Sequence, residues 1–110
     1  MENTPANVIS ELKRIQSDSQ KGVQALYDAE VKLAEAENSL DKAESLAFIN
    51  AEGTVADRQA LAKLESAPVR LERDIAKAEV NRVRTKLKVL ESASIATATI
   101  ARQVELQWRG

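Results

Sequence analysis

The stretch "AEGTVADRQ", residues 51–59, decides how this chain folds, because it interrupts text that otherwise reads as nearly continuous helix. Gly53 either ends a helix or bends one, and a glycine inside a helix costs only about 1 kcal/mol. Thr54, with Asp57 three residues later, adds a second signal, because Thr-x-x-Asp is similar to a capping box. We therefore predict that one helix ends near residues 51–52 and that another begins after Thr54. The alternative is a single bent helix.

Two helical arms joined by a short turn make a long antiparallel hairpin, so the predicted fold class is all-α. Thr4 and Pro5 form a helix start, because threonine can cap the first amides and proline loses no hydrogen bond there. The predicted boundaries are 1–110 for a single domain, about 5–51 for the first arm, about 52–54 for the turn and about 55–107 for the second arm.

The first arm carries a coiled-coil seam with large residues in one column and small residues in the other. The two columns are Leu12, Ser19, Leu26, Leu33, Leu40, Ala47 and Val8, Ile15, Gly22, Ala29, Ala36, Ala43. The small column lets a neighbouring helix approach closely. Ser19 and Gly22 interrupt the seam, which favours a looser turn within one helix over a true break between two helices.

The second arm has an apolar stripe whose phase drifts by one position near residues 75–83. Its members are Leu61, Leu64, Pro68, Leu71, Ile75, Ala78, Val83, Leu87, Leu90, Ser94, Thr97, Ala101, Val104 and Trp108. A spacing nearer 3.6 than 3.5 residues per turn predicts a weaker supercoil than in the first arm. At Pro68 two alternatives stay open: Ser66 caps a new helix, or one helix continues with a kink.

Opposite charges are separated between the arms. Residues 28–57 hold eight acids and two bases, whereas residues 70–88 hold seven bases and three acids. Folding back about Gly53 sets position i beside roughly 105 − i. We therefore expect Arg70 near Glu35, Lys77 near Asp28 and Lys63 near Lys42, and such pairs set register more than stability.

Composition argues against catalysis and against several kinds of partner. The chain has 110 residues, 16 Lys+Arg, 17 Asp+Glu, no Cys and no His. The commonest general base and the commonest nitrogen and sulfur metal ligands are thus missing. We expect no enzyme activity, no cofactor and no metal site. The N-terminal ten residues do not resemble a signal peptide and no apolar run could span a bilayer, so we expect a cytoplasmic protein without membrane contact.

Apolar residues also occur away from the two seams, which predicts a second buried face and hence a homo-oligomer. They are Ile9, Val23, Val31, Leu46, Ile49, Val80, Val89, Ile95, Ile100 and Leu106. A hairpin dimer would make a helical bundle. A lone two-helix hairpin has little interior, which supports the same expectation.

Two further groups are candidates for partner contact. A basic face of the second arm could follow phosphates in a nucleic acid, although no aromatic residue within it could stack bases and nearby acids could neutralise it. Its members are Arg70, Arg73, Lys77, Arg82, Arg84, Lys86 and Lys88. Trp108 and Arg109 either close the bundle against the Val8–Leu12 region or anchor a partner. The small residues of 92–101 favour close helix packing.

The runs "AEGTVADRQALAKLE" and "AEVNRVRTKLKVLES" resemble small coiled-coil accessory proteins of tailed bacteriophages. The resemblance covers about residues 28–92 and is one of pattern and composition. It implies an oligomeric helper among recombination and replication functions, located in the host cytoplasm, and it assigns no functional residues.

These observations predict a non-catalytic, self-associating coiled-coil protein that acts through protein–protein contacts. In a phage setting it could assist recombination or replication, or inhibit a host defence protein or nuclease. The alternative is a nucleic-acid-binding accessory that uses the basic face at 70–88.

Overall fold

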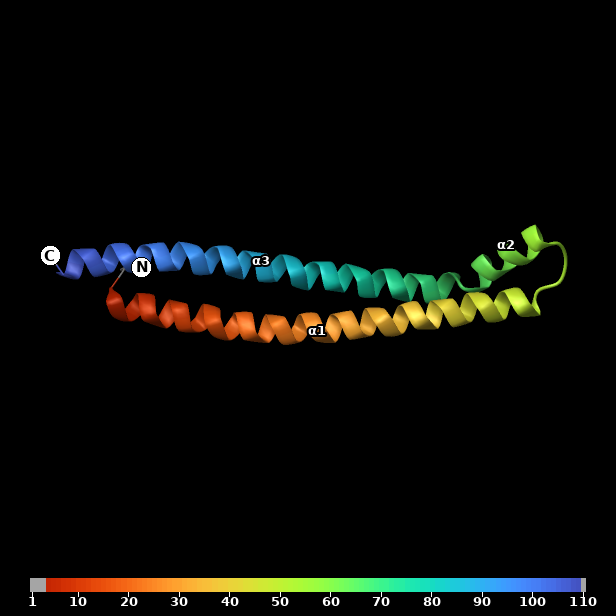
Figure 1. Cartoon of the computed structure of the whole chain (residues 1–110), viewed down its shortest axis with the longest axis horizontal. Helices are drawn as coiled ribbons and strands as arrows, with labels where there is room; N and C mark the ends of the chain where they lie inside the picture. Colours follow the sequence, from red (N-terminus) through yellow and green to blue (C-terminus); the bar gives the residue numbers. More distant parts are fainter. Residues whose placement is uncertain (1–3, 110) are drawn as a thin grey trace. The chain divides into compact units, whose positions relative to one another are not determined.

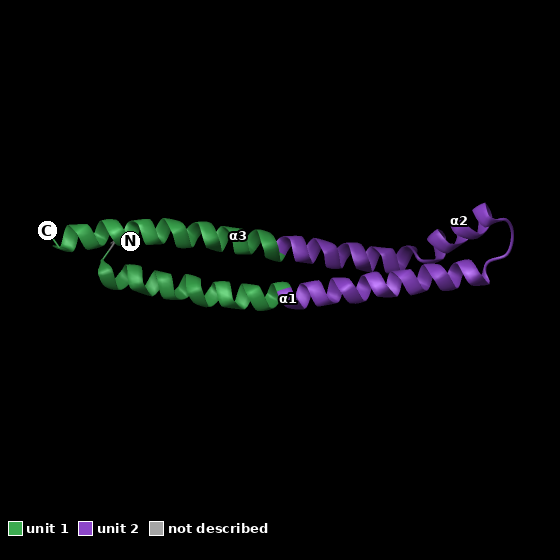
Figure 2. Cartoon of the chain, viewed as in Figure 1, with its two compact units in different colours: residues 1–26, 83–110 green, residues 27–82 purple. Residues whose placement is uncertain are grey.

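The computed structural model describes residues 4–109, which form three helices and no strand. Helix α1 spans Pro5–Asn50, α2 spans Val55–Glu65 and α3 spans Ala67–Arg109 (Figure 1). Helix α1 packs against α3 as a hairpin, which confirms the predicted all-α fold and excludes a single bent helix. The contacts divide the chain into two units, residues 1–26 with 83–110 and residues 27–82 (Figure 2), and each unit pairs part of α1 with part of α3.

Helix α1 begins at the cap that the sequence indicates and continues without interruption. The Asn7 amide donates to Thr4 Oγ1 at 3.2 Å, and the Val8 amide donates to the Thr4 carbonyl at 3.0 Å. The helix passes through Ser19 and Gly22, which confirms one helix here and shows that the alternative of a break is wrong. A Cβ on Gly22 would lie 2.5 Å from Leu87 Cδ2, which shows how closely the two helices approach there.

The seam of α1 is covered in both units. Every residue of its two columns is buried or half-buried, and Val8, Ile15, Ala29, Leu40 and Ala47 are buried. One column of the seam holds large residues and the other holds small ones. This arrangement lets side chains interdigitate across a close helix pair.

The turn between the arms is built from Gly53, Thr54 and Asp57, the residues that the sequence indicates. Gly53 has a φ of 111°, which only glycine adopts without strain. Thr54 Oγ1 accepts from the Asp57 amide at 3.2 Å, while Asp57 Oδ2 accepts from the Thr54 amide at 3.4 Å. This reciprocal capping box satisfies amides that the first turn of α2 leaves open, so Gly53 ends a helix and does not bend one.

The stripe predicted for the first part of the second arm is wrong. The buried or half-buried row is instead Ala62, Ser66, Val69, Arg73, Ala76 and Val80. Leu61, Leu64, Pro68, Leu71, Ile75 and Ala78 are all exposed. Small side chains face α1 here because they allow the helices to approach, and the bulkier residues are turned outward.

From Val83 onward the predicted stripe is correct as far as Val104. Val83 and Val104 are buried, and the members between them are half-buried. The complete row from Ala62 to Val104 keeps alternating steps of four and three residues, which is the heptad spacing. The drift near residues 75–83 is therefore absent, and the expectation of a weaker supercoil loses its basis.

Ser66 and Pro68 mark the break between α2 and α3. The structure there combines the two predicted alternatives, a new helix and a continuing helix with a kink. The backbone at Ser66 stays in the right-handed region, and Pro68 lies in the first turn of α3. Ser66 Oγ donates to the Ala62 carbonyl at 2.7 Å, so its side chain binds the preceding helix and does not cap the next one. The buried row continues in phase across this interruption.

The predicted register is wrong by about two turns for Arg70. Arg70 Nη2 lies 2.8 Å from Glu44 Oε1, where Glu35 was expected. The simple rule treats the chain as two straight helices meeting at a point. Here residues 51–66 include a loop and the separate helix α2, which runs at an angle to α1 (Figure 1) and advances less along it. Arg70 therefore lies closer to the turn than the rule expects.

Candidate interaction surfaces

An outer apolar row runs along α2 and the first part of α3, on the side away from α1. We define the outer apolar row as Leu61, Leu64, Pro68, Leu71, Ile75 and Ala78. Its large members are 39% (Leu61), 72% (Leu64), 61% (Leu71) and 61% (Ile75) exposed. In a helix, these positions lie roughly opposite the row that faces α1. Ala60 and Ala67, both exposed, widen the row on one side.

Two columns of charged side chains with seven-residue spacing run along α2 and the first part of α3. At seven-residue spacing, Glu65, Glu72 and Glu79 form an acidic edge, and Lys63, Arg70 and Lys77 form a basic edge. Helical geometry places the acidic edge next to the outer apolar row, whereas the basic edge lies next to the residues that face α1, with Ala60, Ala67 and Asp74 between it and the row. All six side chains are exposed or half-exposed. The outer apolar row is therefore bordered by the acidic edge on one side and by Ala60, Ala67 and the exposed Asp74 on the other.

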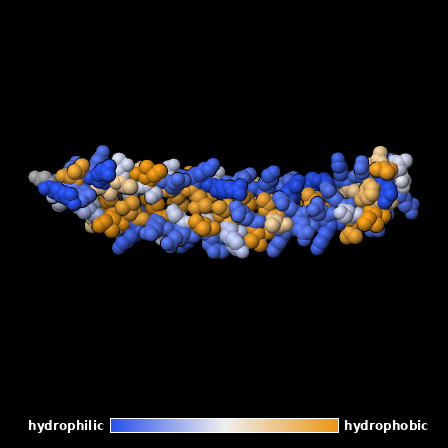
Figure 3. Space-filling model, viewed as in Figure 1, coloured by the Kyte–Doolittle hydropathy of each residue, from blue (hydrophilic) through white to orange (hydrophobic). Residues whose placement is uncertain are grey.

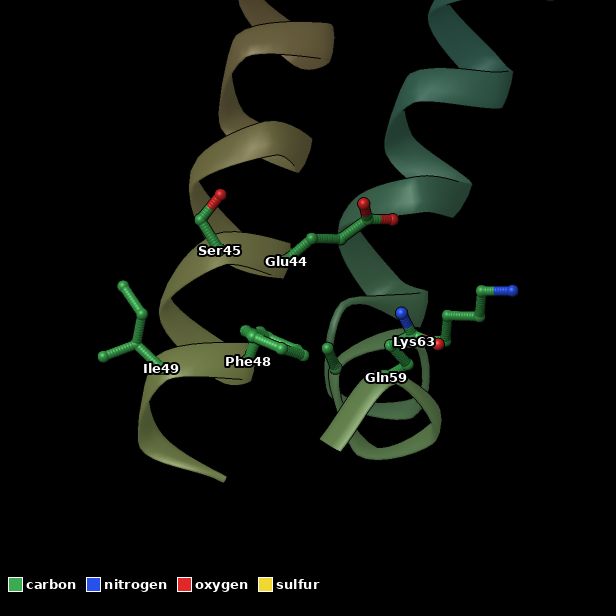
Figure 4. A pocket seen from close by; sticks show the side chains of 7 residues that line it. Glu44, Ser45, Phe48, Ile49, Gln59 and Lys63 are labelled. Atoms are coloured by element: carbon green, nitrogen blue, oxygen red, sulfur yellow. The ribbon is translucent and has the colours of Figure 1, made fainter. Parts of the chain in front are cut away.

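An open groove of about 600 Å³ lies at the turn end of the residue 27–82 unit, between the end of α1 and α2. Figure 4 shows Phe48 directed from α1 toward α2 and Ile49 directed away from it. The Arg58 guanidinium stacks 4.4 Å from the centre of the Phe48 ring and donates to the Phe48 carbonyl at 3.1 and 3.2 Å. Arg58 thus caps the C-terminal end of α1 and holds α2 in contact with it.

Exposed apolar side chains also gather around this turn. Leu46, Ile49 and Val55 are each 59–67% exposed. Figure 3 shows hydrophobic residues reaching the surface at the end of the hairpin where α1 ends and α2 begins.

A smaller groove of about 360 Å³ lies in the other unit, between the start of α1 and the end of α3. Val8, Leu12, Val104 and Trp108 are among its lining residues. Trp108 thus reaches the region where the sequence placed it, but its side chain is 68% exposed and leaves the groove open. Arg109 pairs with Glu105 of its own helix at 2.6 Å.

The structure divides the predicted basic face and engages several of its members. Arg70, Arg73, Lys77 and Arg82 belong to the residue 27–82 unit, and Arg84, Lys86 and Lys88 belong to the other. Arg70 contacts Glu44, Arg73 contacts Asp74 at 2.7 Å, and Arg82 contacts Glu79 at 2.7 Å. Three of the four basic-face residues in the residue 27–82 unit thus carry an acidic partner, which weakens the field available to phosphates.

Two exposed ion pairs within helices shift the pKa of their members. The hydrogen bond from Arg82 holds the pKa of Glu79 below its ordinary value, and the same bond raises the pKa of Arg82. Arg14 lowers the pKa of Glu11 in the same way. Lys32 of α1 adds a smaller lowering at Glu79, which is consistent with the observed register.

No cluster of metal-ligating side chains occurs among residues 4–109. A helix long and apolar enough to cross a membrane is likewise missing from the part of the chain that the structure describes. Comparison with protein-family models, with curated proteins and with solved structures finds no match. The function is therefore inferred from the exposed surfaces of the hairpin.

The outer apolar row was visible in the sequence but assigned to the wrong surface. Its six members are the first six positions predicted for the seam of the second arm. One signal could have separated the two rows: Ala62, Val69, Ala76, Val83, Leu90, Thr97 and Val104 recur every seven residues without a phase change. Taking that column as the seam leaves the outer apolar row facing outward.

Proposed function

We propose that the protein is a non-catalytic, self-associating helical hairpin that acts through protein–protein contacts. The outer apolar row supports this most strongly. Four large aliphatic side chains, two on α2 and two on α3, face solvent on the side of these helices that lies away from α1. Monomeric proteins rarely leave such a contiguous apolar surface uncovered. The role in phage recombination or replication, or against a host defence protein, stays a prediction from resemblance.

Burial of the outer apolar row would add buried apolar area to a hairpin that has a small hydrophobic core. The buried residues that face α1 from α2 and the first part of α3 are mostly Ala, Ser and Val, and each contributes little apolar area. Covering a Leu or Ile side chain contributes about 1.5–3 kcal/mol when the burial is complete. A second copy could therefore supply much of the stability that two paired helices lack.

The test is sedimentation equilibrium of the wild type beside the double variant Leu64→Glu/Leu71→Glu. We expect the wild type to form a dimer or larger oligomer and the double variant to be monomeric with unchanged helicity by circular dichroism. The matched control, Val23→Glu/Ile95→Glu, changes two residues that are 63% and 64% exposed but lie outside the row. It should associate like the wild type.

A monomeric wild type at high protein concentration would refute the proposal. Loss of association in the control, with association kept in the Leu64→Glu/Leu71→Glu variant, would assign self-association to another surface. The nucleic-acid alternative stays a prediction, and the basic residues give it a direct test. Binding of labelled DNA or RNA at low salt, abolished by Arg84→Glu/Lys88→Glu, would support it.

A further inference from the structure

We propose that Arg58 controls self-association by fixing the direction of α2, so that the α2 part and the α3 part of the outer apolar row present one surface to a second copy. This inference rests on the proposed function and concerns the regulation of that same surface. The Arg58 side chain contacts α1 and is not a member of the row. It is therefore a positioning residue, which acts through α2.

The outer apolar row is carried by two helices with a break between them. Leu61 and Leu64 belong to α2. Leu71 and Ile75 belong to α3. Helix α2 runs at an angle to α1, whereas α3 lies alongside α1 (Figure 1). Because no continuous helix connects the two parts of the row, their relative position depends on the direction of α2.

Helix α2 makes few contacts that could fix its direction. Irregular backbone flanks it on both sides, at residues 51–54 and at Ser66. Among its 11 residues only Ala62 is buried and only Arg58 is half-buried, and the others are exposed. An open groove of about 600 Å³ lies between α2 and the end of α1. A helix this short is marginal by itself in water, so the contacts at its two ends determine where it lies.

Arg58 supplies the contact at the first turn of α2. Its Nε and Nη2 atoms donate to the Phe48 carbonyl oxygen at 3.2 and 3.1 Å, and its guanidinium carbon lies 4.4 Å from the centre of the Phe48 ring. That carbonyl belongs to the last turn of α1, where carbonyls lack partners within the helix. A planar guanidinium can donate twice and stack at once, whereas a lysine ammonium cannot. The buried Ala62 and Ser66 hold the other end of α2.

Two points of attachment give α2 one direction, and one point does not. Without the Arg58 contacts, α2 would be attached to α1 only near its C-terminal end. Leu61 and Leu64 would then no longer stay in line with Leu71 and Ile75. A second copy would cover only the α3 part of the row, and association would lose the apolar area that α2 contributes.

Sedimentation equilibrium of Arg58→Met tests this inference, because methionine keeps an unbranched chain but removes the donors and the charge. Its dissociation constant for self-association should rise about tenfold over that of the wild type, since part of the row is lost. Arg58→Lys keeps the charge without the planar fork and should show a smaller rise. The matched control Lys63→Met removes an exposed charge from the same helix and should associate like the wild type.

The direction of α2 within one chain supplies a second readout, which does not depend on association. The chain has no Cys, so nitroxide labels can be attached at Asn38→Cys on α1 and Ala60→Cys on α2, both at exposed positions. Pulsed electron paramagnetic resonance of dilute protein measures the distance between the two labels. We expect a narrow distance distribution with Arg58 present and a broader one in the Arg58→Met background.

The two readouts separate the possible failures. An unchanged distance distribution in Arg58→Met would show that Arg58 does not fix α2, and it would overturn the inference. A broader distribution with a wild-type dissociation constant would overturn it as well and leave the proposed function intact. Equal weakening by Lys63→Met would assign the effect to charge and contradict the role of Arg58. A wild type that sediments as a monomer would refute the proposed function and this inference together.

Discussion

Within the residue 27–82 unit, the two sides of the hairpin use their large apolar residues differently. Helix α1 directs Leu33 and Leu40 toward its partner and presents mostly polar side chains outward. The α2–α3 side directs Ala62, Ser66 and Ala76 inward and its Leu and Ile residues outward. Within this unit the large apolar residues of α1 are packed, whereas the Leu and Ile residues of α2 and α3 are exposed.

This difference follows from how closely the helices approach. Ser66 is only 1% exposed, and its hydroxyl is satisfied by the Ala62 carbonyl, so a polar residue is accommodated in the interface. Small side chains on one helix accept larger ones from the other. Leucines at positions 62 and 66 would push the helices apart. Exchanging the outward leucines for the inward alanines would therefore change how α2 and α3 pack against α1.

The largest expected effect comes from truncating a leucine on the packed side. Leu40 is 7% exposed, and Leu40→Ala should lower the free energy of unfolding by about 2–4 kcal/mol. The matched variant Leu71→Ala should change it by less than about 0.5 kcal/mol at low protein concentration, since that side chain is exposed in the single chain. Urea denaturation of both variants measures the difference. Equal losses at low concentration would contradict the assignment of the two faces.

A smaller effect is expected from enlarging a small residue on the packed side. Ala62→Leu should destabilise the hairpin by about 1–3 kcal/mol, because Ala62 is only 6% exposed and a larger side chain has to displace its buried neighbours. Ala60→Leu, two residues away and exposed, is the control and should be nearly neutral. Thermal unfolding followed by circular dichroism compares them. A stabilised Ala62→Leu variant would show that the interface is loosely packed.

The turn determines which faces of the arms meet. Its disruption should have the next largest effect on the free energy of unfolding. Gly53→Ala should lower the free energy of unfolding by about 1–2 kcal/mol, because φ is 111° and a Cβ would lie 3.1 Å from Asp57 Oδ2. Glu52→Ala, at the exposed neighbouring position, should have little effect. Urea denaturation of the two variants makes the comparison, and equal stabilities would refute the requirement for glycine.

The smallest effect concerns the exposed pair of Glu79 and Arg82. Because the pKa of Glu79 is lower in the folded protein than in the unfolded chain, the pair favours folding at pH values above the unfolded pKa. This contribution is lost as the pH falls through the lowered value. Glu79→Gln should remove that part of the acid dependence in thermal unfolding at low salt. An identical pH profile in both proteins would show that the pair is not maintained.

The sequence predicted one arm of this hairpin more completely than the other, for a physical reason. In α1 the leucines recur in a single column opposite alanines, so only one face could be the seam. Around residues 61–78 two rows compete, and the more hydrophobic one is not the one that packs. Helix–helix approach depends on side-chain size as well as hydrophobicity, and size has to be judged against a partner whose position is not yet known.

The register shows a second limit of reading the sequence. The capping box at Thr54 and Asp57 locates the start of α2, but neither residue indicates that α2 runs at an angle to α1. The Arg70–Glu44 pair depends on that angle. For the same reason the neutralisation of the basic face, and hence the weakness of that candidate site, could be suspected but not located from the sequence.

Cysteine reactivity compares the packed face of α1 and the outer apolar row in one experiment. Leu40→Cys and Leu71→Cys would each be labelled with a maleimide over a range of protein concentrations. We predict slow labelling of the cysteine at position 40 at every concentration, and labelling at position 71 that is fast in dilute protein and slow in concentrated protein. Slow labelling at position 71 in the most dilute sample would place the outer apolar row inside the hairpin. Fast labelling there at every concentration would show that no second copy covers it.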